Sequence, residues 1–439
     1  MKQFQTPRGT NDILPKDIEK WHRIEDVVRQ FCMLYDYKEI RTPIFEDTGV
    51  FKRENDSSDM VNKEMYTFTI NGKDSLTLRP EMTAGVVRSF VQHKMFGEGD
   101  LPAKMYYIGP QFRYERPQKG RQRIFHQFGV EVIGVKNPML DVETIALGYS
   151  IVSALGLSEL KVLLNTLGDD ESRNNYKVAL KEHFSKGIDD MCGDCKRRLD
   201  QNPLRLLDCK VDHDTEIMRT APKMGDYLNK ESKEYFDAVC NGLDALGIPY
   251  EIDDRLVRGL DYYTDTVFEV VSTNDQMGSQ STVFAGGRYD GLVEYFGGPE
   301  LSGIGFAMGI ERLIIALEGE GIDLSEDESL DAYILCLSEK ASLEALKIAT
   351  MLRAAGYTCE RDYLNRSFKA QFKSVERKNA KFAIILGEKD LENGTVTIKE
   401  IATQEQKVVA SEDIVDAMDE LNDNEEHECT CGDECTCGK

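Results

Sequence analysis

The chain of 439 residues lacks long apolar runs, and no stretch approaches the roughly 18 residues that a membrane-spanning helix needs. The first residues, MKQFQTPRGTNDILP, also lack the apolar segment of a secretory signal. We therefore expect no membrane partner and a cytoplasmic location. Cations are scarce as well: 54 Lys and Arg stand against 78 Asp and Glu, a formal net charge of −24. So acidic a protein does not bind nucleic acid through its overall charge, and a polyanion must find a local basic site.

The pattern of a disulfide framework is missing too. The 11 cysteines are odd in number and scattered, which is typical of reduced thiols in a cytosolic protein. Neither G-x-x-x-x-G-K-[ST] nor G-x-G-x-x-G occurs, so a P-loop or dinucleotide site is unsupported. What is present is a composition typical of globular proteins, with 41% hydrophobic and 30% charged residues.

A chain of this length is expected to form roughly two to four domains. Residues 1–168 begin with a helix pattern over 17–32 and continue with strand patterns that do not alternate with helices. This favours an α+β fold, an antiparallel sheet with helices on one side. Residues 169–246 are more charged and mostly helical, and strand patterns return over 247–325. We interpret these three segments as one domain interrupted by a helical insertion.

Residues 330–421 form a separate unit in which strand and helix patterns alternate, which predicts a small α/β domain with a largely parallel sheet. Its stretch 365–381 carries six Lys or Arg and one Glu, a candidate phosphate-contact surface. A solvated helix face is the alternative interpretation. Residues 422–439 are acidic, Cys-rich and too poor in apolar residues to fold alone, so we expect a disordered tail.

Positive charge is concentrated in FRYERPQKGRQRIFHQFGVEVIG, residues 112–134. Between Arg113 and Arg123 this stretch has five cationic residues and one acid. The pattern predicts a β-hairpin whose loop carries the charge. Arg113 falls at a strand end, and its planar guanidinium suits phosphate or carboxylate. The alternative is a solvated hairpin tip with ordinary surface cations.

Two further clusters are rich in arginine, tyrosine and glycine. The first is LVRGLDYYTDTVFEV, residues 256–270, with Arg258 close to two tyrosines. Because neighbouring residues of a strand face opposite sides, at most one of Tyr262 and Tyr263 is expected to point into a given pocket. An ordinary strand edge is the alternative. The second cluster lies within 285–313, where glycine-rich turns flank a strand that leads into a helix.

Over residues 1–421 the chain resembles the histidyl-tRNA synthetases, a family of class II aminoacyl-tRNA synthetases. The matching pieces occur in family order: TPRGTNDILP, EIRTPIFED, TLRPEMTA, FRYERPQKGRQRIFHQFGVEVIG, LVRGLDYYTDTVFE, AGGRYDGL and GFAMGIERL. The resemblance implies the class II antiparallel sheet with flanking helices, an anticodon-binding domain at 330–421, and a homodimer formed through YKEIRTPIFED. It implies attachment of L-histidine to tRNA(His) through a histidyl-adenylate, with ATP and Mg²⁺.

The resemblance also implies roles for individual residues. Arg113 and Arg258 are the expected catalytic cations on the α-phosphate of ATP, and Arg312 is expected on a distal phosphate. The residues expected to bind histidine are Glu81, Thr83, Gln127, Glu131, Arg258, Tyr262, Tyr263 and Tyr289. Those expected to contact the acceptor end of the tRNA are Arg116, Gln118, Lys119 and Arg121.

Within the histidine set, the resemblance assigns the α-ammonium group to Glu81, Thr83 and Gln127, and the imidazole to Glu131 and Tyr263. A neutral imidazole has one donor and one acceptor, so a carboxylate and a hydroxyl satisfy both. A site of such polar groups rejects analogues that lack them, and no editing domain is expected.

Two other functions share this resemblance. A non-catalytic regulatory subunit of ATP phosphoribosyltransferase has the catalytic fold but lacks the anticodon domain and typically loses site residues. An RNA-sensing domain of the same fold is normally fused to a kinase. The α/β unit at 330–421 and the three arginines favour the synthetase.

Two groups of cysteines fall outside the resemblance. In the insertion, the spacing Cys192-x₂-Cys195-x₁₃-Cys209-x₃-His213 suits tetrahedral zinc, and partly buried thiols are the alternative. The sequence alone assigns no metal ligand. The tail has two Cys-x-Cys pairs that could chelate a soft metal, or else belong to an extension with no catalytic role. These tail residues are Cys429, Cys431, Cys435 and Cys437.

Overall fold

The computed structural model has two compact units, residues 1–325 and 326–439. Within them it describes residues 3–52, 58, 60–97, 101–257, 262–274, 281–325 and 329–427, with side chains to residue 422. Arg258 and the four tail cysteines, about which the sequence made predictions, lie outside these described residues.

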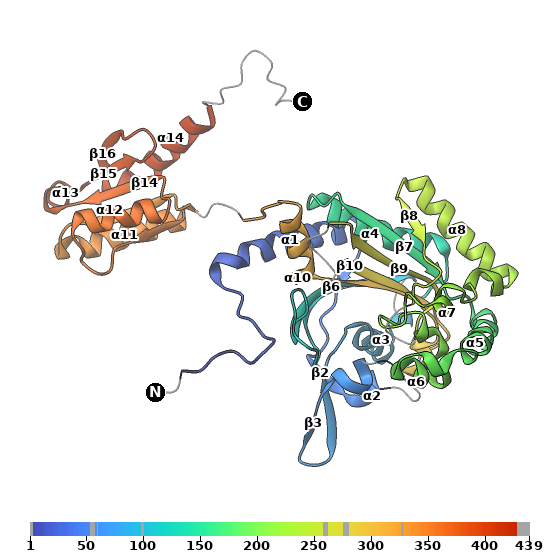
Figure 1. Ribbon diagram of the computed structural model, residues 1–439. Coiled ribbons are helices and arrows are strands. Elements are labelled where there is room, and N and C mark those ends of the chain that lie inside the picture. Colours follow the sequence, from blue (N-terminus) through green and yellow to red (C-terminus); the bar gives the residue numbers. More distant parts are fainter. Residues whose placement is uncertain are drawn as a thin grey trace. The chain divides into compact units, whose positions relative to one another are not determined.

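An eight-stranded sheet forms the centre of the first unit (Figure 1). Its strand order is β1-β5-β6-β11-β10-β9-β7-β8. The neighbours from β5 to β7 pair antiparallel, and only the short edge strands β1 and β8 pair in parallel. The strands are β1 (Lys38–Glu39), β5 (Ala103–Phe112), β6 (Ile124–Ile133), β7 (Leu160–Thr166), β8 (Tyr250–Ile252), β9 (Thr264–Ser272), β10 (Thr282–Tyr289) and β11 (Gly303–Gly309). This sheet and its flanking helices confirm the predicted α+β fold, although helices pack on both faces of the sheet and not on one side alone.

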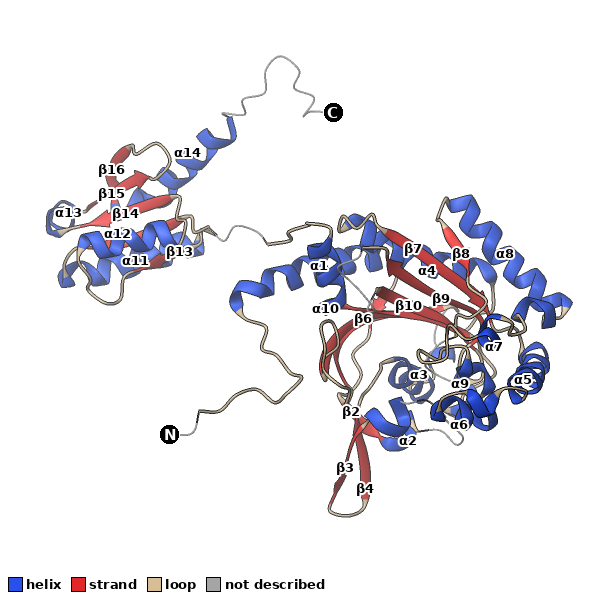
Figure 2. Cartoon of the chain, viewed as in Figure 1, coloured by secondary structure: helices blue, strands red, loops and turns tan. Residues whose placement is uncertain are grey.

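Helices cover one face of this sheet and enclose the main core (Figure 2). They are α1 (Pro15–Leu34), α4 (Pro138–Ala154), α8 (Lys230–Leu246) and α10 (Ile310–Gly319). Helix α4 lies between the sheet and α8, and for this reason apolar residues occur nearly all round it. Helix α8 is the last helix of the segment interpreted as an insertion. Its buried residues Phe236, Val239 and Leu243 nevertheless pack in the main core.

The shorter helices between β7 and α8 have a core of their own, and Figure 1 shows them gathered at one end of the sheet. They are α5 (Asp170–Ser185), α6 (Gly193–Gln201) and α7 (Glu216–Arg219), with 3₁₀ turns at Ile188–Asp190, Pro203–Leu206 and Met224–Tyr227. The predicted insertion, residues 169–246, therefore has a core of its own only as far as residue 228, and we use the name insertion for residues 169–228 from here on. Its core also buries Leu256 and Val257, so the insertion anchors the chain that leads directly to Arg258.

The opposite side of the sheet carries α3 (Thr83–Gln92) and α9 (Leu292–Tyr295). The buried face of α3, which includes Val87 and Phe90, packs with Tyr107 and Tyr289 of the sheet. The first turn of α3 is thereby placed beside the middle of the sheet. A small antiparallel sheet and three short helices complete this side: β2 (Phe45–Asp47), β3 (Tyr66–Ile70), β4 (Asp74–Leu78), α2 (Thr48–Phe51), a π-helix at Met60–Glu64 and a 3₁₀ turn at Met95–Gly97.

The second unit has a five-stranded sheet in the order β13-β12-β14-β15-β16. The first three strands are parallel, as the alternating pattern predicts, and the last two are antiparallel. The strands are β12 (Ala332–Cys336), β13 (Cys359–Arg361), β14 (Phe382–Leu386), β15 (Thr395–Glu400) and β16 (Gln406–Ala410). The helices are α11 (Ser342–Ala354), α12 (Phe368–Arg377), α13 (Glu388–Asn393) and α14 (Ile414–His427), with 3₁₀ turns at Glu339–Ala341 and Ser411–Asp413.

None of the helices in the described part of the chain is long and apolar enough to cross a membrane. The cysteines in that part are all free thiols.

Candidate active site

A cavity opens on the face of the large sheet opposite the main core. Strand β6 explains its position, because alternate residues of a strand face opposite sides. Gln127 and Glu131 face the cavity, whereas Phe128 and Val130 between them pack in the main core. Predicted site residues from separate segments of the chain meet in the cavity wall: Glu81, Thr83, Arg113, Arg121, Gln127, Glu131, Tyr262, Tyr263, Tyr289 and Arg312.

The inner end of the cavity is built around the carboxyl group of Glu131, which is only 1% exposed. Thr83 Oγ1 donates a hydrogen bond of 2.6 Å to Glu131 Oε1, and the Tyr289 hydroxyl donates one of 2.7 Å to Oε2. The Tyr107 hydroxyl lies 3.3 Å from Oε1. Burial raises the pKa of Glu131 to about 8, although these hydroxyl groups oppose the rise. The carboxyl group therefore holds its proton at neutral pH when the cavity is empty.

Two glycines make room for this arrangement. A Cβ atom at Gly305, on β11, would overlap the Glu131 carboxyl group. A Cβ atom at Gly129, on β6, would overlap the Tyr107 hydroxyl. The absence of side chains at these two positions allows the buried Glu131 carboxyl and the buried Tyr107 phenol to lie flat against the sheet.

The tyrosine pair differs from the prediction. Both Tyr262 and Tyr263 line the cavity, with ring centroids 4.9 Å apart, and Tyr262 meets the ring of Tyr289 edge-on at 5.9 Å. The two residues precede β9, which begins at Thr264, and therefore do not follow the alternation of a strand. The prediction that at most one faces the pocket was wrong for this reason. Arg173 of the insertion holds the backbone carbonyl of Tyr263 through a hydrogen bond of 2.9 Å.

The residues predicted for the α-ammonium group lie on both sides of the inner cavity. Glu81 is 5% exposed, and its Oε1 accepts the Ala84 N–H of the first turn of α3 at 3.0 Å. Thr83 is the first residue of α3 and Gln127 faces it from β6. The hydrogen bond from Thr83 to Glu131 joins this group to the inner end.

The outer part of the cavity contains Arg113, Arg121 and Arg312, which we call the arginine end. The Nε atoms of Arg113 and Arg312 donate to the backbone carbonyls of Pro80, at 2.8 Å, and Gly120, at 3.1 Å. Glu115 pairs with Arg121 at 2.6 Å. Burial, and then repulsion by Arg121 and Arg113, lower the pKa of Arg312. Mutual repulsion among guanidinium groups is relieved when an anion binds between them.

The four loop residues predicted to contact tRNA do not share one environment in the structure. Arg116, Gln118 and Lys119 are exposed. The backbones of Gln118 and Arg121 pair with each other across a turn in which Gly120 has φ +70°, a conformation that favours glycine. The side chain of Arg121 turns back to Glu115 and the cavity wall, so its position differs from that of the other three.

Sequence reasoning missed several residues that hold the site. Tyr107 is not among the predicted site residues, although strand alternation could have placed it on the cavity face. The buried pair of Arg288 and Asp141 joins β10 to α4, and both side chains are 0% exposed. Arg288 precedes Tyr289 and faces the other side of β10, so this pair fixes the strand that positions the Tyr289 hydroxyl. Its partner is 147 residues away, and no local signal predicts it.

The insertion cysteines come together, but not with the residue that their spacing suggested. Cys192, Cys195 and Cys209 lie close to Asp212. His213 is exposed instead, with Nδ1 2.9 Å from the Lys210 carbonyl and Nε2 2.9 Å from Asp214. The choice of His213 was wrong because the turn after Cys209 directs the side chain of Asp212 inwards.

Comparisons with known proteins agree with this geometry. The sequence model of the family described as histidyl-tRNA synthetase matches residues 9–313, and an anticodon-binding domain model matches residues 331–421. The histidine--tRNA ligase of Bacillus cytotoxicus is 53% identical over 93% of this chain and 96% of its own length. That of a Geobacillus species is 52% identical over 95% and 99%. The crystal structure of apo histidyl-tRNA synthetase from S. aureus is 44% identical, with a TM-score of 0.81 over 95% of this chain and 100% of the other. The chain belongs to the histidyl-tRNA synthetase family.

Proposed function

We propose that this enzyme activates L-histidine with ATP in the cavity described above and transfers it to tRNA(His), with AMP and pyrophosphate as products. One observation carries the proposal: a buried carboxyl–hydroxyl cluster and a cluster of arginines occupy the two ends of one cavity. The first suits an imidazole and the second suits a polyphosphate. The histidine carboxylate, bound between them, would attack the α-phosphorus and displace pyrophosphate.

Histidine recognition follows from the inner end. The imidazole would pair with Glu131 through one nitrogen and with the hydroxyl of Tyr263 through the other, while Tyr262 and Tyr289 close the wall. Glu81, Thr83 and Gln127 would take the α-ammonium group. A carboxyl with a pKa of about 8 beside an imidazole, whose usual pKa is about 6.5, lets the two groups share one proton across neutral pH.

Phosphate binding follows from the arginine end. The attack of a carboxylate on ATP brings two anions together, so cations must offset the repulsion and the charge of the five-coordinate transition state. Arg113 and Arg258 would act on the α-phosphate and Arg312 on a distal phosphate. The direction of the Arg121 side chain, into the cavity beside Glu115, leads us to assign it to phosphate as well. A contact of Arg121 with the tRNA stays a prediction.

Mg²⁺ prefers oxygen ligands and commonly binds nucleotide phosphates while keeping several waters. Glu115 lines the cavity, and the charges of Glu115 and Glu269 raise the pKa of Arg312, so we assign both carboxylates to the region of the distal phosphates. These residues fit the ion and would hold it with the β- and γ-phosphates. Mg²⁺ would neutralise phosphate charge there.

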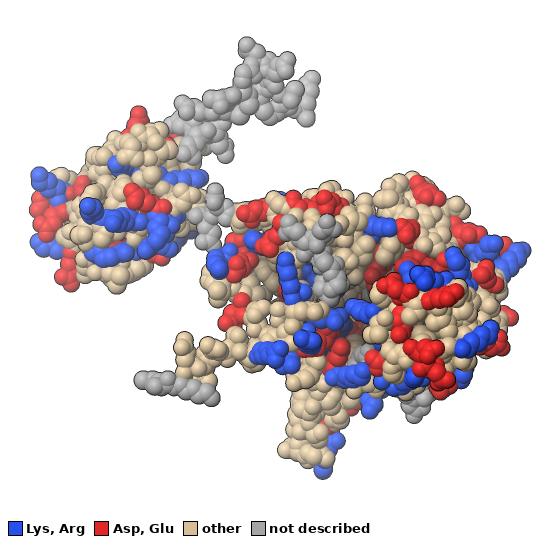
Figure 3. All heavy atoms as spheres, in the orientation of Figure 1, with Lys and Arg blue, Asp and Glu red and all other residues tan. Residues whose placement is uncertain are grey.

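Two surfaces suit the tRNA. The exposed loop residues Arg116, Gln118 and Lys119 precede Gly120 and Arg121, which line the cavity, and they would meet the acceptor end. In the second unit, Figure 3 shows Lys and Arg side chains running across the face formed by α11 and α12. Lys369, Lys373 and Arg377 of α12 are exposed and recur at four-residue spacing, which puts them on one side of the helix. We assign this side to phosphate contacts near the anticodon.

A homodimer fits the exposed apolar side chains around EIRTPIFED. Monomeric proteins rarely leave such a group uncovered. The side chains are Met33, Leu34, Ile44, Phe45, Phe68 and Ile70, each at least 39% exposed. We place the enzyme in the cytoplasm, in keeping with the free thiols of the described cysteines.

The test of the activity is histidine-dependent exchange of pyrophosphate into ATP, followed by charging of tRNA(His). We expect exchange with histidine alone among the common amino acids. Folded protein that gave no exchange would contradict the proposal, and would leave the non-catalytic regulatory function as the explanation for this fold.

A further inference from the structure

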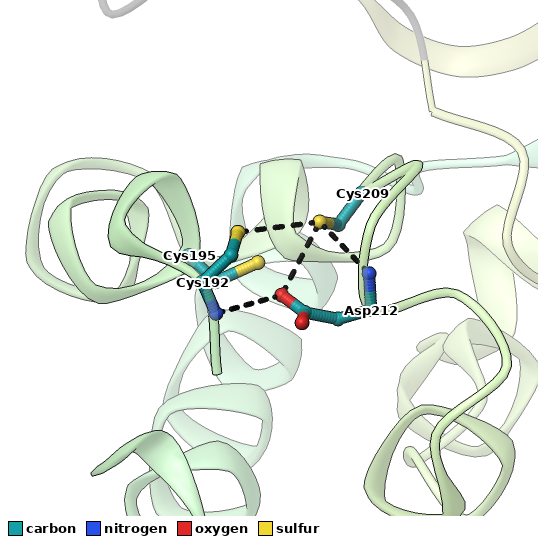
Figure 4. Close-up of side chains that lie close together, drawn as sticks. All are labelled: Cys192, Cys195, Cys209 and Asp212. Carbon is teal, nitrogen blue, oxygen red and sulfur yellow. Dashed lines mark hydrogen bonds between the residues drawn. The ribbon is translucent and has the colours of Figure 1, made fainter. Parts of the chain in front are cut away.

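Three cysteines and one aspartate of the insertion converge on a common point, as Figure 4 shows. The sulfur atoms of Cys192, Cys195 and Cys209 and a carboxylate oxygen of Asp212 all lie within 4.8 Å of one another. Cys192 Sγ is 3.7 Å from Cys209 Sγ, and Cys209 Sγ is 3.3 Å from Asp212 Oδ2. A tetrahedral zinc ion with Zn–S bonds of about 2.3 Å holds its sulfurs about 3.8 Å apart. The distance between the Cys192 and Cys209 sulfurs matches this spacing, and all four ligand atoms lie within 4.8 Å of one another.

The backbone holds the four side chains in two turns of the same design. Cys192 and Cys195 are separated by two residues at the start of α6, and Cys209 and Asp212 are separated by two residues in a later turn. The Cys192 N–H donates to Asp212 Oδ2 at 3.1 Å and so joins the two turns. The Asp212 N–H points at Cys209 Sγ at 3.4 Å, a contact that supports a thiolate. Pairs of ligands two residues apart are frequent in structural zinc sites.

Burial argues against an ordinary cluster of thiols. Cys195 is 0% exposed, Cys209 4% and Asp212 6%. A carboxylate buried at this depth needs a counter-charge, because a buried charge is otherwise costly. Yet the contacts of the Asp212 carboxylate come from the Cys192 backbone and from the cysteine thiols, and no Lys or Arg of the described residues forms an ion pair with it. A disulfide would use two of the four groups and leave the carboxylate uncompensated.

We propose that Cys192, Cys195, Cys209 and Asp212 form a structural zinc site. Four protein ligands leave no open position, which is typical of structural and not of catalytic zinc. Cys192 is only half-buried, so the ion enters from its side. Binding converts three thiols to thiolates and releases their protons. The ion ties the start of α6 to the later turn, within the core that also holds Leu256 and Val257.

The experiment measures metal in the full chain purified under reducing conditions, with the four tail cysteines replaced by serine so that only the insertion can supply a thiolate cluster. We expect about one zinc per chain, and after exchange with Co²⁺ the intense visible absorption of tetrahedral cobalt with sulfur ligands. Cys209→Ser should lose the metal. Asp212→Asn should keep the fold and weaken zinc retention in competition with a chelator.

Two matched controls separate this site from other groups. Cys240→Ser removes a half-buried cysteine outside the cluster, and His213→Ala removes the ligand that the spacing alone suggested. Both should retain zinc at the level of the parent. Absence of stoichiometric metal from the folded parent together with no cobalt spectrum would overturn the proposal, and so would stoichiometric iron in place of zinc. Loss of zinc in His213→Ala with retention in Asp212→Asn would overturn the ligand set.

Discussion

The two ends of the cavity differ in the charged groups that form them and in how those groups are held. At the inner end Glu131 is buried, accepts hydrogen bonds from Thr83 and Tyr289, and has its pKa raised to about 8, so this carboxyl carries little charge at neutral pH. At the arginine end three guanidinium groups are gathered in the cavity wall, and the Nε atoms of Arg113 and Arg312 donate hydrogen bonds to backbone carbonyls. The inner end selects its ligand through buried hydrogen-bond donors and acceptors that the ligand must satisfy. The arginine end provides a positive electrostatic potential that attracts a polyanion.

Removing the cations that we propose for the α-phosphate should have the largest effect. We expect Arg113→Ala and Arg258→Ala each to lower the adenylation rate by roughly 10³-fold or more, because an arginine on a transferring phosphoryl group contributes about this much. Histidine binding should change far less. Single-turnover adenylation and equilibrium binding of histidine measure the two effects separately. Arg23→Ala, on the exposed side of α1, is the control. Equal losses in both measurements would mean that these arginines only bind ground states.

Changing the inner end should weaken histidine and leave ATP alone. Glu131→Gln keeps the size of the side chain but removes the shared proton. We expect kcat/KM for histidine to fall by roughly 10²-fold or more, since loss of a buried charge-assisted pair costs about 2–5 kcal/mol. The KM for ATP should stay within a small factor. Glu143→Gln, a partly exposed carboxyl that pairs with Lys104, is the matched control. A similar loss for both substrates would show that the ends are not separate.

The pKa of Glu131 also makes a prediction about stability. Its folded pKa of about 8 lies above the usual 4.5, so between these values the folded protein binds more protons than the unfolded chain. Its contribution to stability is therefore fully present below pH 4.5 and is lost as the pH rises through about 8. The stability of the parent relative to Glu131→Gln should fall with pH by up to about 1.4 kcal/mol per unit in this window. Urea unfolding of both proteins across this range measures the slope, and a flat difference would contradict the raised pKa.

The smallest effect is expected from a change that touches neither end. Lys369→Ala with Lys373→Ala should raise the KM for tRNA several-fold and reduce its salt dependence by about one unit of slope per lost phosphate contact. Pyrophosphate exchange should be unchanged, because it needs no tRNA. Lys389→Ala, exposed on α13, is the control. Unaltered charging across a range of salt would remove α12 from the tRNA surface.

Sequence reasoning succeeded where a local period decides the structure. The hairpin of β5 and β6 was predicted from two strand patterns joined by a charged loop, and the structure confirms it. It failed for Tyr262 and Tyr263, because the start of β9 lies one residue beyond the pair and alternation does not reach them. It also failed for the fourth residue of the cysteine cluster, since spacing does not say whether Asp212 or His213 turns inwards.

Contacts between residues that are far apart in the sequence could not be predicted, for a different reason. The pairing of Arg288 with Asp141 depends on how α4 packs against β10, which no short stretch encodes. The assignment of α8 to the main core has the same origin, because an amphipathic pattern shows that a helix has a buried face but not what covers it. The side chain of Arg121 is a smaller example: the loop was predicted, but its direction depends on Glu115.

The glycines beneath the inner end limit how this enzyme can evolve. Gly129 and Gly305 lie on the cavity face of the sheet, directly beneath the side chains of Tyr107 and Glu131. A mutation that reshapes the pocket for another amino acid must therefore keep glycine at both positions, or else displace the Glu131 carboxyl or the Tyr107 phenol. Substitutions of the side chains that line the cavity can therefore produce only some of the possible amino-acid specificities. The other specificities require changes at these glycines together with changes in the side chains that rest on them, which places them several mutational steps away.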